Sequence, residues 1–484
     1  MNNITERRVD NGSAERLLSR SDANDFICDR EDPIWVGIER AVSNGCGTVF
    51  VSDGTGVLLG RVEIDDLRGA IAAGAHLKNA TLKQFVKPIS TNDQNSVAIP
   101  VIDAECRIVG VTLDHKRRFV PVAEPDLAVG ELRNLLDAFL STWISSTGAY
   151  ITEFEQRFAS RMGMAHGIAT SNGTVSLQLA LASLGIGAGD EVIVPDFTFA
   201  GSANAVIHAG ARPVLVDVDP DTWCITPEAI RAAITPRTRA VMPVHVFGRA
   251  APMEEISDVA HEHGLFVIED CAEAHGASYN GRPVGSFSHV SSFSFFANKI
   301  ITTGEGGICL TNDADLAARL RMLRDHGMRP ERRYWHEEPG FNFRMTNIQA
   351  AIGCAQLDRL DELLAMRRTV QSIYEAAFDG IDGIELMRKR ERPYEDVIWF
   401  ACARVPASAR PHLIEACRKE KIDIRPFFNS LSSMPAYKKY ARACPNSRAL
   451  AREGINLPTS RRVTPALAEE IATIFRVVLK DHTI

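Results

Sequence analysis

The 484-residue sequence lacks several features that would place it in a membrane or outside the cell. It has no apolar run of the ~18 residues that cross a bilayer, and its ten cysteines form no CxxC pair. The first residues do not have the pattern of a signal peptide, so we expect reduced thiols and a cytoplasmic protein. A net charge of −7 offers no basic excess for nucleic acid or an anionic membrane, and we expect neither as a partner.

The composition that remains is typical of a folded globular protein, with 45% hydrophobic and 24% charged residues. A chain of this length exceeds one compact core, so it should form several domains. We predict a flexible tail over residues 1–25, an accessory domain over 26–117, a large domain over 118–375 and a small domain over 376–484.

The accessory domain contains a pattern that occurs twice. Strands are predicted at Thr48–Val51 and Val57–Val62, followed by a helix that opens with acidic residues at Glu63–Arg68. A shorter copy has strands at Ala98–Asp103 and Arg107–Val111. The repeat resembles a CBS-type nucleotide-sensing module. A plain α/β domain used for oligomer contacts is the alternative.

The large domain alternates short apolar runs with helical stretches. The runs are Glu191–Pro195, Pro213–Asp217, Ala240–Val244 and Leu265–Asp270. Because such near-continuous apolar strands are buried on both faces, we predict an α/β fold with a mostly parallel sheet between two layers of helices.

Helical spacing then dominates the sequence toward the C-terminus. One long helix is predicted from apolar residues that share a face: Ile348, Ile352, Leu357, Leu360 and Leu364. Strands at Trp399–Val405 and Ile422–Arg425, with helices around them, predict a small α+β domain at the C-terminal end.

One lysine stands out in the segment Ser291–Gly307, which begins as an apolar strand and becomes a glycine-rich loop. Lys299 has no acidic residue within four positions on either side. Burial lowers the pKa of a lysine, and the neutral amine can then attack a carbonyl to form a Schiff base. The alternative is a surface lysine in a flexible loop.

Three other segments carry side chains suited to a flat, phosphorylated cofactor. In Ser171–Leu177 a small polar loop enters an apolar helix, whose N-terminal amides bind phosphate unless the loop is a simple cap. Phe199 follows a strand, where it can stack on a ring or simply pack. Asp270 ends a buried strand, where it can hold a pyridinium nitrogen or cap a helix.

Longer motifs connect these segments to a known family. They are Pro243–His245, Glu269–Ala277, Asn298–Lys299 with Thr302–Gly307, Arg332–His336 and Arg344–Ala351. From about Val120 to its C-terminus the chain resembles the DegT/DnrJ/StrS family of pyridoxal-phosphate (PLP) sugar aminotransferases. The resemblance implies a fold type I PLP-transferase architecture. Cys271, Ala297 and Asp196 depart from the usual family residues.

The resemblance also implies roles for residues around the cofactor ring. Lys299 binds PLP as a Schiff base and moves the proton during the reaction. Asp270 pairs with the pyridine nitrogen, Glu273 lies near the ring hydroxyl, and Phe199 stacks on the ring.

At the other end of the cofactor, the resemblance implies that Gly173, Thr174 and Ser294 hold the phosphate. Asn342 would reach that phosphate from a neighbouring subunit, which implies a homodimer with shared active sites.

The implied reaction transfers an amino group from L-glutamate to the 4-keto group of a nucleotide-linked 4-keto-6-deoxyhexose. GDP-4-keto-6-deoxymannose, giving GDP-perosamine for surface polysaccharide or O-antigen biosynthesis, is the favoured substrate. The candidates for the sugar or base pocket are His326, Tyr334, Trp335 and His336.

Two other functions stay open. The ketosugar could be UDP- or dTDP-linked, or the protein could be a nucleotide-sensing regulator with a vestigial PLP fold. No metal is expected, because the pair His261 and His263 has no evident third ligand and is interpreted as facing solvent.

Overall fold

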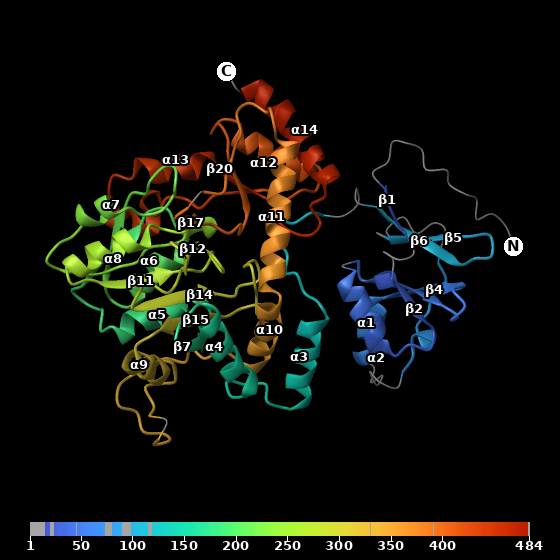
Figure 1. Ribbon diagram of the computed structural model, residues 1–484, viewed down its shortest axis with the longest axis horizontal. Helices are drawn as coiled ribbons and strands as arrows, with labels where there is room; N and C mark the ends of the chain where they lie inside the picture. The colour runs from blue at the N-terminus through green and yellow to red at the C-terminus, as the bar shows by residue number, and fades with distance from the viewer. Residues whose placement is uncertain are drawn as a thin grey trace. The chain divides into compact units, whose positions relative to one another are not determined.

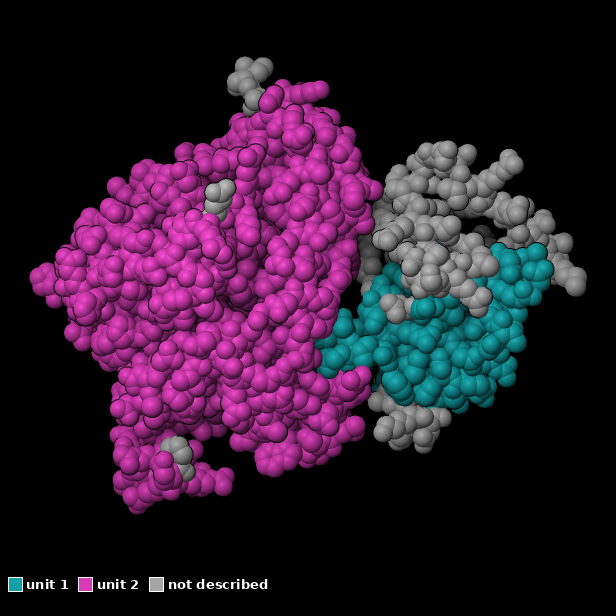
Figure 2. Space-filling model, viewed as in Figure 1, with its two compact units in different colours: residues 1–119, 127–132 teal, residues 120–126, 133–484 magenta. Residues whose placement is uncertain are grey.

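The computed structural model describes residues 15–19, 24–44, 46–72, 80–89, 98–114, 119–329, 331–390 and 392–482. The chain divides into two compact units, one of residues 1–119 and 127–132 and one of residues 120–126 and 133–484 (Figure 2). Among the described helices, none has both the length and the apolar character needed to cross a bilayer.

The first unit contains two three-stranded sheets, in the orders β2-β3-β4 and β1-β6-β5. Its elements are β1 (Glu15–Ser19), η1 (Asn24–Phe26), β2 (Ile27–Asp29), α1 (Ile34–Ser43), β3 (Thr48–Ser52), β4 (Leu58–Glu63), α2 (Ile64–Ala72), η2 (Leu82–Gln84), β5 (Ala98–Ile102) and β6 (Ile108–Asp114). The strands and the acidic helix predicted in this region are therefore present. The CBS-like assignment stays a prediction.

Part of the flexible tail predicted for residues 1–25 is a β-strand. Residues Glu15–Ser19 form β1 and pair antiparallel with β6, because an edge strand offers backbone groups to any extended neighbour. Residues 1–14 and 20–23 of that tail, and the predicted domain boundary at 117/118, lie outside the described residues.

The second unit is built on a seven-stranded sheet in the order β7-β15-β14-β11-β10-β8-β9 (Figure 1). Its strands are β7 (His166–Thr170), β8 (Glu191–Pro195), β9 (Arg212–Val216), β10 (Thr238–Val241), β11 (Phe266–Asp270), β14 (Val290–Ser294) and β15 (Gly307–Thr311). Only β15 runs against its neighbours, while the pairs from β9 to β14 are parallel. The predicted mostly parallel sheet is confirmed.

Alternate residues of these strands enter two different hydrophobic cores. In β8, for example, Ile193 faces the core beneath α4 and α8, whereas Val192 and Val194 face the core beneath α5, α6 and α9. The helices of these cores include α4 (Ala149–Arg161), α5 (Gly173–Ser183), α6 (Gly201–His208), α7 (Pro227–Arg231), α8 (Met253–Glu262) and α9 (Ala314–Arg324); α3 (Val129–Leu140) precedes them in the chain. The sheet is thus covered on both faces, as its apolar strands require.

The C-terminal part adds a four-stranded antiparallel sheet, β16-β18-β20-β19, with its own core. The remaining elements are η4 (Val246–Gly248), β12 (Ser278–Tyr279), β13 (Arg282–Pro283), α10 (Asn347–Asp358), α11 (Leu360–Ala377), β16 (Glu385–Leu386), β17 (Tyr394–Glu395), β18 (Ala401–Arg404), α12 (Arg410–Lys419), β19 (Arg425–Pro426), η5 (Leu431–Ser433), η6 (Pro435–Tyr440), α13 (Pro445–Glu453), β20 (Gly454–Leu457) and α14 (Pro465–His482).

Two local predictions in this part were wrong. The single long helix is two helices, α10 and α11, separated at Arg359, whose φ of −99° and ψ of 4° leave the helical region. The strand predicted at Ile422–Arg425 is replaced by one bridge from Ile422 to Val120 and by β19, because the segment that follows Phe119 pairs there.

Candidate active site

The loop that carries Lys299 joins two antiparallel strands, β14 and β15, and is held by its own hydrogen bonds. The amide of Phe295 donates to the carbonyl of Gly306, and the Thr302 hydroxyl donates to the carbonyl of Phe295 at 2.9 Å. The Thr303 amide donates to the same carbonyl at 3.0 Å. This is an ordered turn, not the flexible surface loop of the alternative interpretation.

The Lys299 side chain is only 10% exposed. Its Nζ lies 4.0 Å from Glu273 Oε1 and 4.0 Å from the centroid of the Trp399 ring system. A carboxylate and an indole therefore lie next to this amine. Burial lowers the pKa of Lys299, and the charges of Glu273 and Asp270 oppose that change.

Asp270 is the last residue of β11, at the carboxyl end of the parallel sheet. Its Oδ2 accepts a hydrogen bond from Ser202 Oγ at 2.8 Å, and its Oδ1 accepts one from the Ala272 amide at 3.2 Å. Burial raises the pKa of this carboxyl group, while the two hydrogen bonds and Lys299 act in the opposite direction. A cationic ring nitrogen beside it would stabilise its ionised form.

Glu273 follows in the turn after β11. Its Oε2 accepts a hydrogen bond from the Phe247 amide at 2.7 Å, while its Oε1 faces Lys299. Burial raises the pKa of Glu273 to about 7, against the charge of Lys299. The carboxyl and the amine therefore face each other as a buried pair whose ionised forms both lose solvation.

The predicted phosphate site forms where α5 begins against the end of β14. Asn172 caps the helix by accepting a hydrogen bond from the Val175 amide at 3.0 Å. A Cβ added to Gly173 would lie 2.7 Å from Ser294 Cβ, so only glycine allows this close approach. The first-turn amides of α5 and the Ser294 side chain thus lie side by side, an arrangement suited to an anion.

Phe199 lies in the turn between β8 and α6, and the residue is 58% exposed. A Cβ on Gly201 would lie 3.0 Å from Thr174 Oγ1 and 3.2 Å from Phe199 Cδ1, so the ring and the phosphate loop share this neighbour. An exposed aromatic face beside an anion site fits a flat phosphorylated ring.

The remaining predicted site residues lie in the segment 325–344. Asn342 is exposed, and its Oδ1 accepts hydrogen bonds from Arg344 Nε at 3.3 Å and Nη2 at 3.2 Å. His326 Nε2 lies 3.5 Å from Arg344 Nη2, and the His326 carbonyl lies 2.8 Å from His336 Nδ1.

Tyr334 and Trp335 are exposed in the same segment, with Arg333 and Arg332 over their rings. Among the residues that the structure describes, no hydrogen bond, ion pair or ring contact joins the candidates of this segment to Lys299 or Asp270. Their roles stay predictions.

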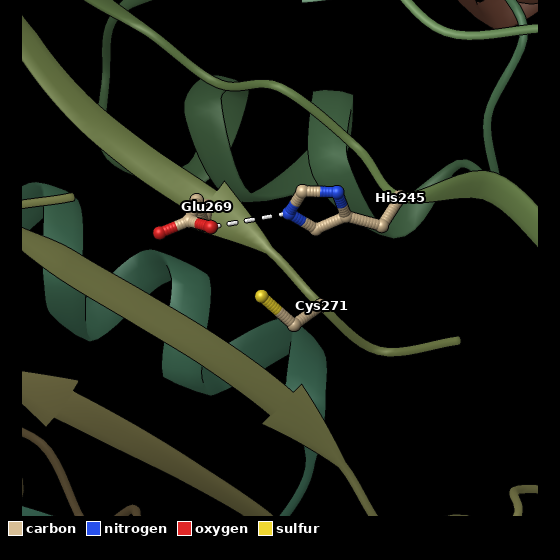
Figure 3. Close-up of side chains that lie close together, drawn as sticks. All are labelled: His245, Glu269 and Cys271. Atoms are coloured by element: carbon tan, nitrogen blue, oxygen red, sulfur yellow. Dashed lines mark hydrogen bonds and ion pairs between the residues drawn. The ribbon is translucent and has the colours of Figure 1, made fainter. Parts of the chain in front are cut away.

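A buried cluster of His245, Glu269 and Cys271 has donor atoms within 4.8 Å of one another (Figure 3). His245 Nδ1 accepts a hydrogen bond from the Ala251 amide, so Nε2 carries the proton and donates to Glu269 Oε1 at 3.2 Å. Glu269 also accepts from the Gly285 amide. With its nitrogens used in this way, His245 has no lone pair left for a metal.

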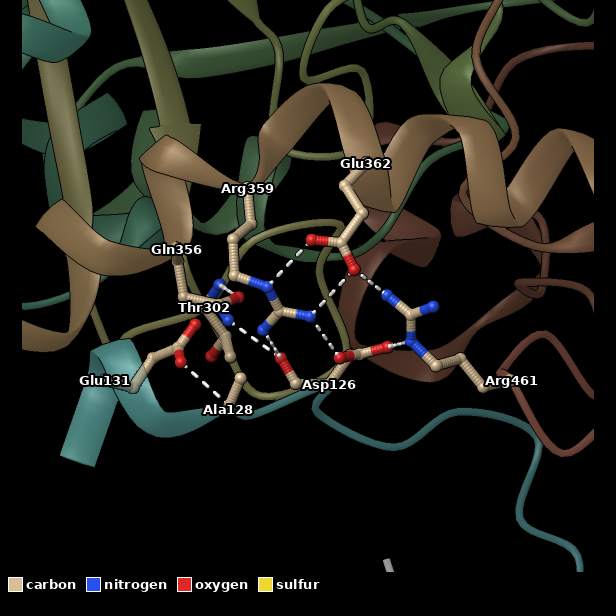
Figure 4. Close-up of polar contacts among 8 residues, drawn as sticks. All are labelled: Asp126, Ala128, Glu131, Thr302, Gln356, Arg359, Glu362 and Arg461. Atoms are coloured by element: carbon tan, nitrogen blue, oxygen red, sulfur yellow. Dashed lines mark hydrogen bonds and ion pairs between the residues drawn. The ribbon is translucent and has the colours of Figure 1, made fainter. Parts of the chain in front are cut away.

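A polar network supports the Lys299 loop from the side of α10 and α11 (Figure 4). Gln356 Oε1 accepts a hydrogen bond from the Thr302 amide at 3.1 Å, and its Nε2 donates to the carbonyl of Asp126 at 2.8 Å. Arg359 binds the Asp126 carbonyl at 3.0 Å and its carboxylate at 2.6 Å. Arg461 pairs with the same carboxylate. The extended segment before α3 is thereby tied to the loop of the lysine.

These groups fit PLP chemically. The exposed ring of Phe199, the buried carboxyl of Asp270 and the cradle at Gly173 suit an aromatic ring, a ring nitrogen and a phosphate, in that order. Register places Asp270 of β11 beside Ser292 of β14, so the ring-nitrogen and phosphate residues come from neighbouring strands.

Comparison with known proteins agrees with this geometry. A model of the DegT/DnrJ/EryC1/StrS aminotransferase family matches residues 125–476. The chain belongs to this family. Members with solved structures share its fold: DesV of S. venezuelae is 34% identical with a TM-score of 0.68, over 72% of this chain and 93% of DesV.

Two other members are informative. A GDP-perosamine synthase of Caulobacter vibrioides is 45% identical over 370 residues, which are 74% of this chain and 98% of that protein. The PLP form of the putative sugar aminotransferase Spr1654 of Streptococcus pneumoniae is 27% identical with a TM-score of 0.71, over 75% of this chain and 99% of Spr1654. The chain is therefore an aminotransferase with the fold type I architecture.

Sequence reasoning missed four residues that the fold brings to the site: Ser202, Gln356, Arg367 and Trp399. Ser202 lies only three residues beyond Phe199, so its helical spacing was a usable signal. The others lie 57 to 100 positions from Lys299, and no local pattern connects them to it.

Proposed function

We propose that the protein uses PLP to transfer the amino group of L-glutamate to the 4-keto group of GDP-4-keto-6-deoxymannose. The product is GDP-perosamine, for surface polysaccharide or O-antigen biosynthesis. The observation that carries the proposal is the buried Lys299 amine, 4.0 Å from Glu273, in a chain that spans 98% of a GDP-perosamine synthase at 45% identity.

The residues of the chain have distinct tasks in this reaction. When bound, PLP supplies an electron sink that allows the amino group to leave one carbon and join another. Lys299 Nζ accepts and returns the proton at the reacting carbon, and the burial that lowers its pKa favours the neutral amine that can accept it. Asp270 keeps the ring nitrogen protonated, and the negative charge of Glu273 stabilises the protonated form of the lysine.

The start of α5 would hold the phosphate end of PLP. The amides of Gly173 and Thr174, together with the Ser294 hydroxyl, would donate to the phosphate oxygens. Phe199 would cover one face of the ring. Such contacts would keep the reacting carbon within reach of Lys299.

A homodimer with shared sites is part of the proposal. Exposed apolar side chains follow one another at the end of α3: Phe139, Leu140, Trp143 and Ile144. Leu140 is 70% exposed and lies among other exposed apolar side chains. Such a group favours a surface that a second subunit covers. Asn342 would complete the phosphate site of the second subunit.

Mixing two inactive variants tests the shared site. Lys299→Ala and Asn342→Ala homodimers should each lose activity, and activity should return after subunits exchange, since one site of each mixed dimer is intact. No recovery between subunits that do exchange would place Asn342 outside the partner's site.

The cytoplasmic location also belongs to the proposal. All ten cysteines are free thiols, and only Cys106 is exposed, as in a reducing compartment.

Product mass spectrometry tests the substrate. The protein, with PLP and L-glutamate, is offered GDP-, UDP- and dTDP-linked 4-keto-6-deoxysugars in parallel. We expect the GDP sugar alone to exchange its keto oxygen for an amine, with Lys299→Ala as the inactive control. Preferential amination of a UDP or dTDP sugar would replace the proposed nucleotide, and no amination of any sugar would support the regulatory alternative.

A further inference from the structure

Trp399 contacts the Lys299 loop at two points. Its indole Nε1–H donates a hydrogen bond to the carbonyl of Asn298 at 2.8 Å, and its ring centroid lies 4.0 Å from Lys299 Nζ. Trp399 is 3% exposed, so neither contact competes with water. One side chain therefore touches both the backbone next to the lysine and the amine itself.

Arg367 of α11 holds the backbone of Trp399 in turn. Its Nη1 donates to the Trp399 carbonyl, and its Nη2 lies 3.5 Å from the Lys299 carbonyl. Arg367 is 4% exposed, so α11 fixes the indole and the lysine loop relative to each other. The indole is a rigid part of the site.

The other groups around the amine carry charge or can titrate. Glu273 and Asp270, from the end of β11 and the turn after it, favour the ammonium form. Burial of the amine opposes them. His275 stays neutral because burial lowers its pKa to about 3. Trp399 contacts the amine and has no charge at any pH, so its effect does not change with pH.

An ammonium over the face of an indole is attracted by the ring's negative face, and the attraction grows when both groups are desolvated. The neutral amine does not gain this energy. The indole therefore offsets part of the cost of keeping a proton on the buried lysine.

We propose that Trp399 is the positioning residue of Lys299: its N–H fixes the loop at Asn298, and its ring face holds the amine beside Glu273 and raises its proton affinity. The proposal rests on the role proposed above for Lys299.

Fluorinated tryptophan tests the ring face without changing its shape. The cofactor-free protein is prepared with mono-, di- and trifluorinated tryptophan, and the pKa of Lys299 is measured from the pH dependence of acetylation by acetic anhydride, read by mass spectrometry. Fluorine withdraws electron density from the ring and leaves the N–H in place. We expect the Lys299 pKa to fall stepwise, by about one unit over the series.

Lys439 is the internal control, because its amine lies over the Tyr440 ring, 4.9 Å from the centroid, and should label equally throughout. A Lys299 pKa that stays constant across the series would overturn the proposal.

Two substitutions separate the ring face from the N–H. Trp399→Phe keeps an aromatic face and should keep most of the Lys299 pKa, whereas Trp399→Leu should lower it by about one unit. The exposed Trp143→Leu is the matched control. Equal pKa values in the Leu variant and the wild type would contradict the proposal, and the fluorinated series decides if that variant does not fold.

These measurements use neither substrate nor PLP. A protein that shows the pKa series but aminates no sugar would refute the proposed function and leave the role of Trp399 intact.

Discussion

Two buried aspartates stand at the same edge of the large sheet and serve different purposes. Asp196 directly follows β8, and Asp270 ends β11, with one strand between them. Burial raises the pKa of both carboxyl groups, and both accept a hydrogen bond from a serine.

The two carboxylates differ in the number of hydrogen bonds that each accepts. Asp196 accepts from Ser430 Oγ at 2.5 Å, from the Ser432 amide at 2.6 Å and from Ser432 Oγ at 3.1 Å. These donors come from η5 and from Ser430 directly before it, more than 230 positions away in the chain. Asp196 is one of the departures from the usual family residues, and its carboxylate anchors a turn that is distant in the sequence.

Asp270 has one hydroxyl and one long amide contact, and it lies near Lys299. A buried carboxylate with spare acceptor capacity can bind a cation, whereas the three donors to Asp196 leave it less capacity to do so. The comparison is consistent with the role proposed for Asp270 in the reaction and with a structural role for Asp196.

The sharpest test is Asp270→Asn, which removes the charge and keeps an acceptor for Ser202. We expect kcat to fall by about 10²–10³-fold, because the group that stabilises the ring cation is lost. Stability measured by urea unfolding should be unchanged or higher, since burying a charge is costly. Activity within tenfold of the wild type would break the comparison.

Asp196→Ala should lower stability and leave kcat nearly unchanged, which is the reverse of the result expected for Asp270→Asn. Two hydroxyls and one amide of Ser430 and η5 lose their acceptor, so the free energy of unfolding should fall by about 3 kcal/mol, with kcat nearly constant at a temperature where the variant is folded. Urea titration measures the first quantity and steady-state kinetics the second. A selective loss of kcat would mean that Asp196 also contributes to catalysis.

The carboxylate of Glu273 accepts a hydrogen bond from one amide. Its pKa of about 7 exceeds the ordinary value of 4.5. The folded protein therefore binds the proton more tightly than the unfolded chain. This contribution to stability is complete below pH 4.5 and is lost as the pH rises to 7.

In the cofactor-free protein, Glu273→Gln should remove this dependence. The free energy of unfolding of this variant, relative to that of the wild type, should rise by about 1 kcal/mol per pH unit between pH 5 and 7. Urea titrations at each pH test this, with the exposed Glu470→Gln as the control. Parallel pH profiles of Glu273→Gln and the wild type would argue against a raised pKa.

The smallest effects should come from the two serines. Ser202→Ala should reduce kcat about fivefold with little change in stability, and Ser430→Ala should reduce stability by about 1 kcal/mol with little change in kcat. The pair is matched in chemistry, so identical phenotypes would show that both carboxylates have the same role.

Much of the fold followed from local patterns. The apolar runs at Glu191–Pro195 and Leu265–Asp270 match β8 and β11 closely, because a short apolar run can be recognised from neighbouring residues alone. The helix start at Gly173 is likewise local, as Asn172 caps it from one position away. The break at Arg359 was not predicted, and the guanidinium of that residue binds Asp126 of a distant segment.

The sequence by itself determined the family, the parallel sheet and the placement of Asp270 and Lys299 at the ends and turns of strands. Only the tertiary structure decided what contacts the lysine, and which of two similar aspartates accepts more hydrogen bonds. Trp399 lies 100 positions from Lys299, and Ser430 lies 234 positions from Asp196. Contacts over such separations depend on the packing of whole helices and sheets, which short-range periodicity does not encode.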